Sequence, residues 1–220
     1  MSKLELSRPT LIMIYGFPGA GKTFLARQLS DDLLAANIQS DRIRSEIFEQ
    51  PRYDKQEDDN VSRLTEYMVD EFLKAGLSVV LDANILGLGQ RRNLRNLAQK
   101  HKVKTLIIWV QIDLESAFDR AIRRDHRKVD DRYAKKYDRT AFEYFVGRMQ
   151  NPQISEDYVV ISGKHNYQTQ RAAIVKRLYD LGLIQTKTAT DKLIKPGLVN
   201  LVPNINGGRV DSTRRNISIR

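Results

Sequence analysis

Eight consecutive residues near the N-terminus have the types and spacing that suit phosphate binding. They read Gly16-Phe17-Pro18-Gly19-Ala20-Gly21-Lys22-Thr23 and fit the pattern G-x-x-x-x-G-K-[ST] at every fixed position. The glycines permit backbone dihedrals closed to other residues, so that N–H groups can face phosphate oxygens. Lys22 adds a positive charge for the β- and γ-phosphates, and the hydroxyl of Thr23 is suited to Mg²⁺. The segment therefore predicts a nucleotide-phosphate site, with ATP and Mg²⁺ as its ligands.

The elements on either side of this segment support that interpretation. The apolar run Leu11–Tyr15 predicts a buried strand, and an amphipathic helix is expected from Lys22 to about Asn37. A helix that begins at Lys22 directs the positive end of its dipole toward a bound anion. The alternative, a chance glycine-rich turn, does not account for this strand and helix.

Short apolar runs continue to alternate with amphipathic stretches along the chain. Further strands are expected before Asp41 and at 77–81, 103–112 and 158–161, with helices between them. This alternation is typical of βαβ units around a parallel sheet. We expect an α/β fold, a P-loop NTPase three-layer sandwich with a mainly parallel five-stranded sheet in the order 2-3-1-4-5. This domain spans residues 1–185.

Several classes of P-loop protein are excluded by missing residues. A GTPase needs the base-reading tetrapeptide N-K-x-D, which does not occur in the chain. Many hydrolytic ATPases carry Asp-Glu after an apolar strand, whereas Asp82 is followed by Ala83 and Asn84. The kinases remain, in which a substrate hydroxyl takes the place of water.

Two further segments carry a resemblance to a known group of kinases. They are Asp41-Arg42-Ile43-Arg44 and Leu81-Asp82-Ala83-Asn84, which an arginine-rich segment follows. Over about residues 8–183 the chain resembles the zeta-toxin and polynucleotide-kinase-like group of P-loop kinases. The resemblance implies that Asp41 is the general base on the acceptor hydroxyl and that Arg44 holds an acceptor phosphate or carboxylate. The alternatives are a helix N-cap for Asp41 and a solvated helix position for Arg44.

Asp82 and Asn84 are further candidates on the acceptor side. Asp82 ends a strand beside the phosphate-binding loop, where a carboxylate can hold Mg²⁺ through water or orient the acceptor. The alternative is an aspartate that caps a turn. Asn84 lies on the loop beyond it, with Arg91 and Arg92 at the start of the next helix. Those two arginines are expected at the surface.

The segment at about 120–139 is expected to form a helical lid over the nucleotide. It holds nine Lys and Arg against four Asp, a net charge of +5. Arg120, Arg124 and Arg127 are spaced by four and three residues, which would place them on one helical face. Guanidinium groups there can neutralise charge on a transferring phosphoryl group, and Arg120 and Arg124 are the catalytic candidates. Asp125, Asp130 and Asp131 are candidates for latching the lid. The residues around Gly163 are expected to frame the adenine.

A second basic segment, 186–220, also carries +5, so it and the lid account for the whole net charge of +10. It is rich in Gly and Pro and is expected to be an irregular arm that contacts nucleic acid or protein. The chain has no cysteine, which excludes disulfides and Cys-ligated metals. No apolar run approaches the length of a membrane span, so a cytoplasmic protein is expected.

The sequence thus predicts an ATP-dependent phosphotransferase that moves the γ-phosphate to a hydroxyl of a small molecule or a polynucleotide 5′ end. The alternative is a nucleotide-binding regulatory ATPase whose basic arm binds RNA or a protein partner. A toxin that phosphorylates a cell-wall sugar nucleotide follows only from the resemblance and ranks below both.

Overall fold

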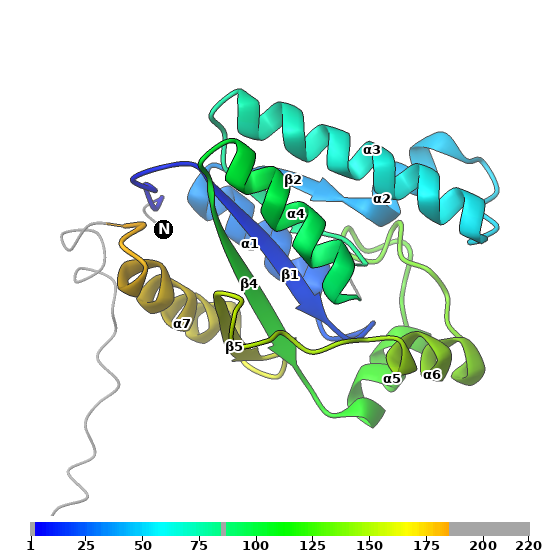
Figure 1. The fold of residues 1–220 in the computed structure, drawn as a ribbon. Coiled ribbons are helices and arrows are strands. Elements are labelled where there is room, and N and C mark those ends of the chain that lie inside the picture. Colours follow the sequence, from blue (N-terminus) through cyan, green and yellow to red (C-terminus); the bar gives the residue numbers. More distant parts are fainter. Residues whose placement is uncertain (1–2, 85–86, 185–220) are drawn as a thin grey trace, which may run out of the picture.

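Five parallel strands form one sheet in the order β2-β3-β1-β4-β5 in the computed structural model, which describes residues 3–84 and 87–184. The predicted fold class and strand order are confirmed (Figure 1). The strands are β1 Thr10–Gly16, β2 Ala36–Gln39, β3 Val79–Asp82, β4 Lys104–Gln111 and β5 Tyr158–Ser162. The basic arm at 186–220 lies outside the described residues.

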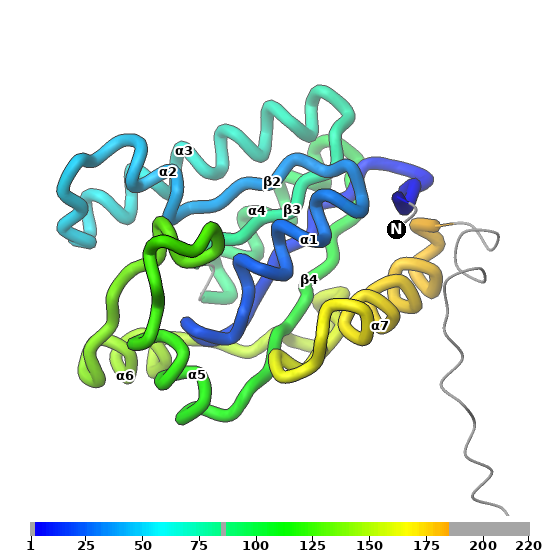
Figure 2. Tube along the Cα trace, turned by 180° about the vertical axis from the view of Figure 1, so that it is seen from behind, coloured from blue at the N-terminus to red at the C-terminus, as the bar shows by residue number. Residues whose placement is uncertain are grey.

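Helices cover both faces of the sheet. They are α1 Lys22–Leu33, α2 Ser40–Ile47, α3 Lys55–Lys74, α4 Leu88–Lys100, α5 Leu114–Ile122, α6 Arg139–Gly147 and α7 Tyr167–Asp180. Helices α1 and α7 pack on one face, whereas α3 and α4 pack on the other (Figures 1 and 2). Among the described helices, none has the length and apolar character needed to cross a membrane.

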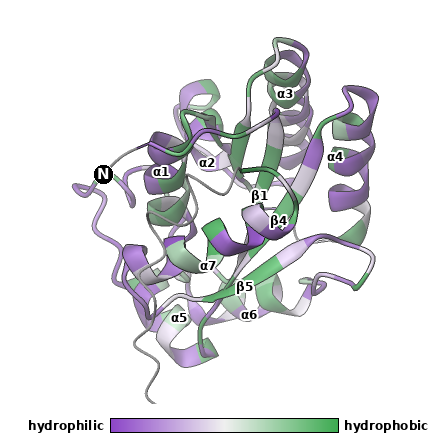
Figure 3. Cartoon of the chain, turned by 90° about the vertical axis from the view of Figure 1, so that its left-hand side faces the viewer, coloured by the Kyte–Doolittle hydropathy of each residue, from purple (hydrophilic) through white to green (hydrophobic). Residues whose placement is uncertain are grey.

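The two faces of β1 supply the centre of two cores. Ile12 and Ile14 pack toward α1 and α7, while Leu11, Met13 and Tyr15 pack toward α3 and α4. All seven residues of the strand are buried, and the hydropathy of the strands contrasts with that of the outer helix surfaces (Figure 3). A parallel sheet covered on both faces explains why its strands read as continuous apolar runs.

The first helix is shorter than its periodicity predicts. It ends at Leu33, and Leu34 takes a left-handed conformation with φ of 52°. The chain then enters β2, so the helix predicted to Asn37 is wrong over its last four residues. Strand β2 has four residues, too few for its period to stand out from a preceding helix.

The lid is helical only at its ends. Helix α5 ends at Ile122 and α6 begins at Arg139, with turns between them. The shared helical face expected for Arg120, Arg124 and Arg127 is therefore wrong. Aspartates explain the difference, because Asp125 accepts a hydrogen bond from the backbone N–H of Arg127, and Asp131 accepts one from that of Asp125. Such local bonds compete with helical ones.

Candidate active site

The phosphate-binding loop joins β1 to α1 and lies directly against α5. Gly19 and Gly21 have φ of 80° and 95°, in the left-handed region that favours glycine. A Cβ on Gly19 would lie 2.1 Å from the carbonyl oxygen of Ala117 and 2.9 Å from the nitrogen of Ala121. A Cβ on Gly21 would meet nothing within 4 Å. Glycine at position 19 thus permits both the turn and the contact between the loop and α5.

The side chains of Lys22 and Thr23 join this loop to its surroundings. The ammonium of Lys22 donates to the carbonyl oxygens of Gly16 (2.9 Å) and Phe17 (3.0 Å), so the side chain folds back across the loop. The hydroxyl of Thr23 donates to the carboxylate of Asp82 at 2.7 Å. The two residues predicted to hold Mg²⁺ are therefore in contact.

Asp41 and Asp82 follow neighbouring strands. Gln39 and Asp82 are in register in the β2–β3 pair, and Asp41 lies in the first turn of α2, just beyond β2. Carboxyl ends of parallel strands meet at one edge of a sheet, which brings both acids to the phosphate-binding loop. Asp41 is not the helix N-cap, because Gln39 holds that position and no side chain caps the helix.

The charges in this cluster perturb one another. Burial, reinforced by the charge of Asp82, raises the pKa of Asp41 to about 6. Burial also raises the pKa of Asp82 and lowers that of Lys22 to about 8. The charge of Arg124 reaches all three groups and holds the pKa of both acids lower than burial alone would. Perturbed groups in one cleft are typical of reacting centres.

A cavity of about 370 Å³ separates the phosphate-binding loop from the lid. We call it the nucleotide pocket; its lining includes Lys22, Thr23 and the predicted lid residues Arg120 and Arg124. The guanidinium of Arg120 donates to the carbonyl oxygen of Gly163 at 2.9 Å. This bond joins α5 to the loop after β5, where the adenine was expected.

The three candidate latch aspartates have different partners. Asp130 accepts two hydrogen bonds from Arg27 of α1, at 2.8 and 3.1 Å, and so holds the lid against the helix that follows the phosphate-binding loop. Asp131 and Asp125 pair within the lid, with Arg124 (4.0 Å) and Arg127 (2.9 Å) respectively.

A larger cavity of about 850 Å³ lies on the other side of the lid segment. We call it the α3–α6 cavity, since α3, α4, α6 and the lid contribute to its walls. Its lining includes two of the three predicted acceptor residues, Arg44 and Asn84, but not Asp82. Aromatic rings and cations from the turn before α3, from the lid and from α6 and the residue after it contribute to its lining: Tyr53, Lys135, Tyr137, Tyr144, Phe145 and Arg148.

Arg44 is buried, and its charge is balanced within the protein. Its guanidinium donates to Glu57 at 3.0 Å and to Asp58, and it lies 4.8 Å from the centre of the Tyr53 ring. Burial alone would raise the pKa of Glu57, but hydrogen bonds from the Arg52 and Tyr53 N–H groups and from Arg44 lower it. Arg44 therefore ties α2 to the first turns of α3, and its role toward an acceptor stays a prediction.

Arg91 is not at the surface, contrary to expectation. Its side chain has no exposed area and donates two hydrogen bonds of 3.0 Å to Glu156. The side chain of Glu156 is also fully buried. Arg91 also donates to the carbonyl oxygens of Gln150 (2.8 Å) and Asn151 (3.2 Å). Arg91 thus fixes the segment between α6 and β5. Arg92, next to it, is exposed as expected.

Three residues that line the α3–α6 cavity were missed by the sequence reasoning. The ammonium of Lys135 lies 4.6 Å from the ring centre of Tyr53 and 5.6 Å from that of Tyr137. These rings and this cation span the α3–α6 cavity from the turn before α3 to the lid. For Lys135 and Tyr137, the sequence does contain a signal of such a cluster, because tyrosines and basic residues are mixed in 132–137.

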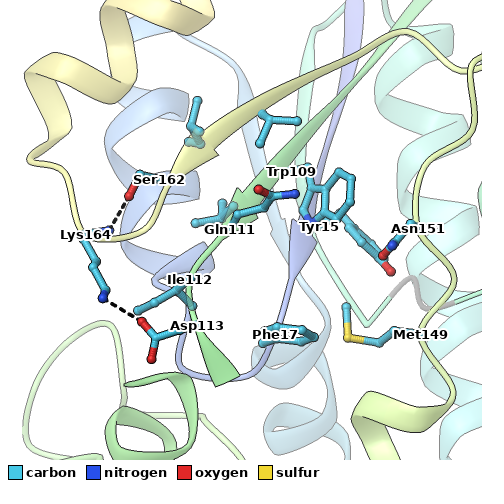
Figure 4. Close-up of a pocket in the computed structure, with 13 residues that line it drawn as sticks. Tyr15, Phe17, Trp109, Gln111, Ile112, Asp113, Met149, Asn151, Ser162 and Lys164 are labelled. Atoms are coloured by element: carbon cyan, nitrogen blue, oxygen red, sulfur yellow. Dashed lines mark hydrogen bonds and ion pairs between the residues drawn. The ribbon is translucent and has the colours of Figure 1, made fainter. Parts of the chain in front are cut away.

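A third cavity, of about 750 Å³, lies over β4 and β5 on the α4 side of the sheet (Figure 4). Its lining includes Phe17 of the phosphate-binding loop and Lys164, next to Gly163, where the adenine is expected. Lys164 and Asp113 pair at one end, 2.6 Å apart. Residues 148–151 line two cavities alternately: Met149 and Asn151 face this one, whereas Arg148 and Gln150 face the α3–α6 cavity.

Solved structures with the same fold include several kinases. A sugar kinase from Janibacter sp. HTCC2649 aligns with a TM-score of 0.58 and 14% identity, over 82% of this chain and 98% of that one. The APS kinase CysC of Mycobacterium tuberculosis, in complex with AMPPNP and APS, gives 0.59 and 14%, over 78% and 98%. Kti12 of Chaetomium thermophilum, in complex with ADP-AlF3, gives 0.59 and 21%, over 77% and 97%. At such identities these alignments show a shared fold.

The sequence of the chain identifies its family. No curated protein matches the chain. A model of the AAA domain family matches residues 11–152, which include the phosphate-binding loop, Asp41, Asp82 and the lid. The match covers well over half of the chain and includes the residues brought together at the edge of the sheet. The protein is therefore a member of the AAA domain family.

Proposed function

We propose that the protein is an ATP- and Mg²⁺-dependent phosphotransferase that acts on a hydroxyl acceptor in the α3–α6 cavity. One observation carries the proposal: Lys22, Thr23, Asp41 and Asp82 meet at one edge of the sheet, beside the phosphate-binding loop. Ser40, next to Asp41, and Arg44, one helical turn further, line the larger α3–α6 cavity. A hydrolase needs room for water alone, whereas a cavity of about 850 Å³ suits an organic acceptor.

The nucleotide side of the site suits Mg²⁺·ATP. The loop N–H groups and the N-terminus of α1 would face the phosphates, and Lys22 would exchange the carbonyl oxygens of Gly16 and Phe17 for phosphate oxygens. Thr23 and Asp82 are hard oxygen donors in contact, which suits Mg²⁺ directly or through water. The ion, when bound, neutralises charge on the phosphates. Arg120 and Arg124 add positive charge from the lid side.

Asp41 is the proposed general base. Its carboxylate makes no hydrogen bond with any residue in the described ranges, which leaves both oxygens available to an acceptor. It accepts the proton of the acceptor hydroxyl while that oxygen forms a bond to the γ-phosphorus. The bond from the γ-phosphorus to the β–γ bridging oxygen breaks, and ADP leaves with that electron pair. The proton on Asp41 passes to solvent as the products depart.

The acceptor class is proposed from the cavity and from the fold. The aromatic rings and cations of the cavity lining, together with carboxylates of α3, suit an acceptor of mixed polarity. A small molecule and a polynucleotide 5′ end both fit this description. Structures with the same fold include a sugar kinase, a gluconokinase and an APS kinase, which supports phosphoryl transfer to a small hydroxyl compound. The narrower resemblance to zeta toxins and polynucleotide kinases keeps the 5′-hydroxyl end of a polynucleotide as a second acceptor class.

The test is transfer of label from γ-labelled ATP, with Mg²⁺, to a panel of sugars, sugar nucleotides, nucleosides and 5′-hydroxyl oligonucleotides. We expect one class to accept the label, and Lys22→Ala to abolish turnover. Asp41→Asn should keep ATP affinity within about threefold and lose transfer by about 10²-fold or more, since a general base contributes that much. Asp31→Asn, which removes an exposed carboxylate of α1 outside the lining of all three cavities, is the control and should retain transfer. Full transfer by Asp41→Asn would overturn the assignment.

A further inference from the structure

Residues 135–137 separate the nucleotide pocket from the α3–α6 cavity and contact groups in both. The carbonyl oxygen of Lys135 accepts a hydrogen bond from the guanidinium of Arg124 at 3.1 Å. The side chains of Lys135 and Tyr137 line the α3–α6 cavity, whereas Arg124 lines the nucleotide pocket. One short segment therefore holds a nucleotide-side cation with its backbone and meets an acceptor with its side chains.

Tyr137 is the rigid part of this segment. It is 9% exposed and packs edge-on against Phe142 and Phe145 of α6, with ring centres 6.3 and 5.9 Å apart. It belongs to a small core that includes Ala117 and Ala121 of α5. Its ring centre lies 5.8 Å from the guanidinium carbon of Arg124, within the range of a cation–π contact. The ring thus gives Arg124 a wall fixed on both lid helices.

Arg124 has few other constraints on its position. Its nearest carboxylate, that of Asp131, is 4.0 Å away, and the side chain is 15% exposed. Without the ring of Tyr137 and the carbonyl of Lys135, it would be held by that distant pair alone. An arginine acts on a transferring phosphoryl group only when it is placed before the reaction, so the groups that place it matter.

Lys135 connects the same segment to the acceptor side. Its ammonium lies between the rings of Tyr53 and Tyr137 and has no carboxylate partner among the residues described. Its position therefore depends on two aromatic faces that also line the α3–α6 cavity. A compound that occupies this cavity against those faces must contact or displace the ammonium.

We propose that Tyr137 is a positioning residue for Arg124, and that the same short segment, through the side chain of Lys135, takes part in binding the acceptor in the α3–α6 cavity. The proposal rests on the proposed function, because it assigns the transferring phosphoryl group to one pocket and the acceptor to the other. Tyr137 does not touch the phosphates; it acts through Arg124. The side chain of Lys135 contributes to acceptor binding, while its backbone carbonyl contributes to the placement of Arg124.

The test uses the full chain and needs no knowledge of the acceptor. Isothermal titration calorimetry compares the affinity for Mg²⁺·ADP with that for Mg²⁺·ADP and aluminium fluoride, a mimic of the transferring group. Arg124→Ala and Tyr137→Leu should each lower affinity for the mimic about tenfold, with ADP affinity within twofold of the unaltered protein. Tyr137→Phe keeps the ring and should restore the affinity for the mimic. Lys135→Met keeps the carbonyl and should bind the mimic normally.

Tyr133→Leu is the matched control, because Tyr133 lies in the lid two residues before Lys135 and contacts Arg132 rather than Arg124. Equal loss of affinity for ADP and for the mimic in Tyr137→Leu would show a merely structural role and overturn the proposal. A selective loss in Arg124→Ala without one in Tyr137→Leu would also overturn it, while leaving the proposed function standing.

Transfer to the acceptor found in the labelling panel tests the second half of the proposal. Lys135→Met should raise the acceptor KM at least threefold with kcat nearly unchanged, whereas Tyr137→Leu should lower kcat. Failure of the proposed function is recognised separately, as the absence of transfer by the unaltered protein. An unchanged acceptor KM in Lys135→Met would overturn the assignment of the Lys135 side chain to acceptor binding.

Discussion

Asp41 must be ionised to accept a proton, yet its surroundings disfavour its charge. Burial and the neighbouring Asp82 raise its pKa to about 6, while Lys22, Arg124 and Arg44 oppose that rise. A base with a pKa just below the working pH is largely deprotonated and still basic enough to remove a proton. The same residue is therefore suited to catalysis and unfavourable for stability.

The rate of transfer should follow this ionisation. Because the ionised form is the active one, kcat/KM should rise with pH through about 6 and then level off. Below that pKa it should fall about tenfold for each pH unit. Initial rates at saturating ATP and limiting acceptor, measured from pH 4.5 to 8, check this. A flat profile between pH 5 and 7 would contradict the role of Asp41.

Removal of the charge should stabilise the fold. The pKa of Asp41 is raised from 3.8 to about 6 in the folded protein, so the folded state binds the proton more tightly. That contribution is present below pH 3.8 and is lost as pH rises through 6. Asp41→Asn should therefore raise the Tm at pH 7.5 and change it little at pH 4. Calorimetric scans at both values check the difference, with Asp31→Asn as the control.

At the scale of elements, Arg91 of α4 organises the segment that links α6 to β5. Its guanidinium is fully buried against Glu156 and also binds two backbone carbonyls of that segment. A buried pair of this kind is costly to break, because the remaining partner keeps an uncompensated charge.

Arg91→Met should lower the free energy of unfolding by about 3–5 kcal/mol, the typical cost of an orphaned buried charge. Arg95→Met removes a partner of Glu156 that lies 3.7 Å away and is 24% exposed. It should cost no more than about 1 kcal/mol. Addition of Glu156→Leu to Arg91→Met should recover part of the loss. Urea unfolding followed by far-UV circular dichroism gives the free energy of unfolding of the unaltered protein and of the three variants.

The sequence predicted those parts of the site that depend on local order. Asp41 and Asp82 follow strands, and the carboxyl ends of parallel strands converge. The partners of Arg44 and Arg91 could not be predicted, because Glu57 and Glu156 reach them through tertiary packing. The lid was predicted as helical from the spacing of its arginines, but aspartates between them bind backbone N–H groups instead.

At the scale of the whole molecule, nucleotide binding and folding should be linked through the sheet. Trp109, the single tryptophan of the chain, lies in β4 between Tyr15 of β1 and Tyr158 of β5, with ring centres 6.0 and 6.4 Å away. The indole therefore reports on the three strands that carry the phosphate-binding loop and the loop expected at the adenine.

Mg²⁺·ADP should stabilise the protein against unfolding. At a hundred times its Kd, a ligand that binds only the folded state adds about 2.7 kcal/mol. Urea unfolding followed by Trp109 fluorescence should shift to higher urea with ADP, and Lys22→Ala should reduce the shift. A shift of equal size in Lys22→Ala, at the same ADP concentration, would argue against binding at the phosphate loop.

Residues 148–151 form a wall only one chain thick, with one cavity on each side. Met149 and Asn151 bound the cavity over β4 and β5, while Arg148 and Gln150 bound the cavity assigned to the acceptor. Arg91 donates hydrogen bonds to the carbonyl oxygens of Gln150 and Asn151, and these bonds restrict movement of the wall. The volumes of the two cavities are therefore coupled. A substitution that moves this wall toward one cavity makes that cavity smaller and the other larger. Selection for a bulkier acceptor would therefore also reshape the cavity over β4 and β5.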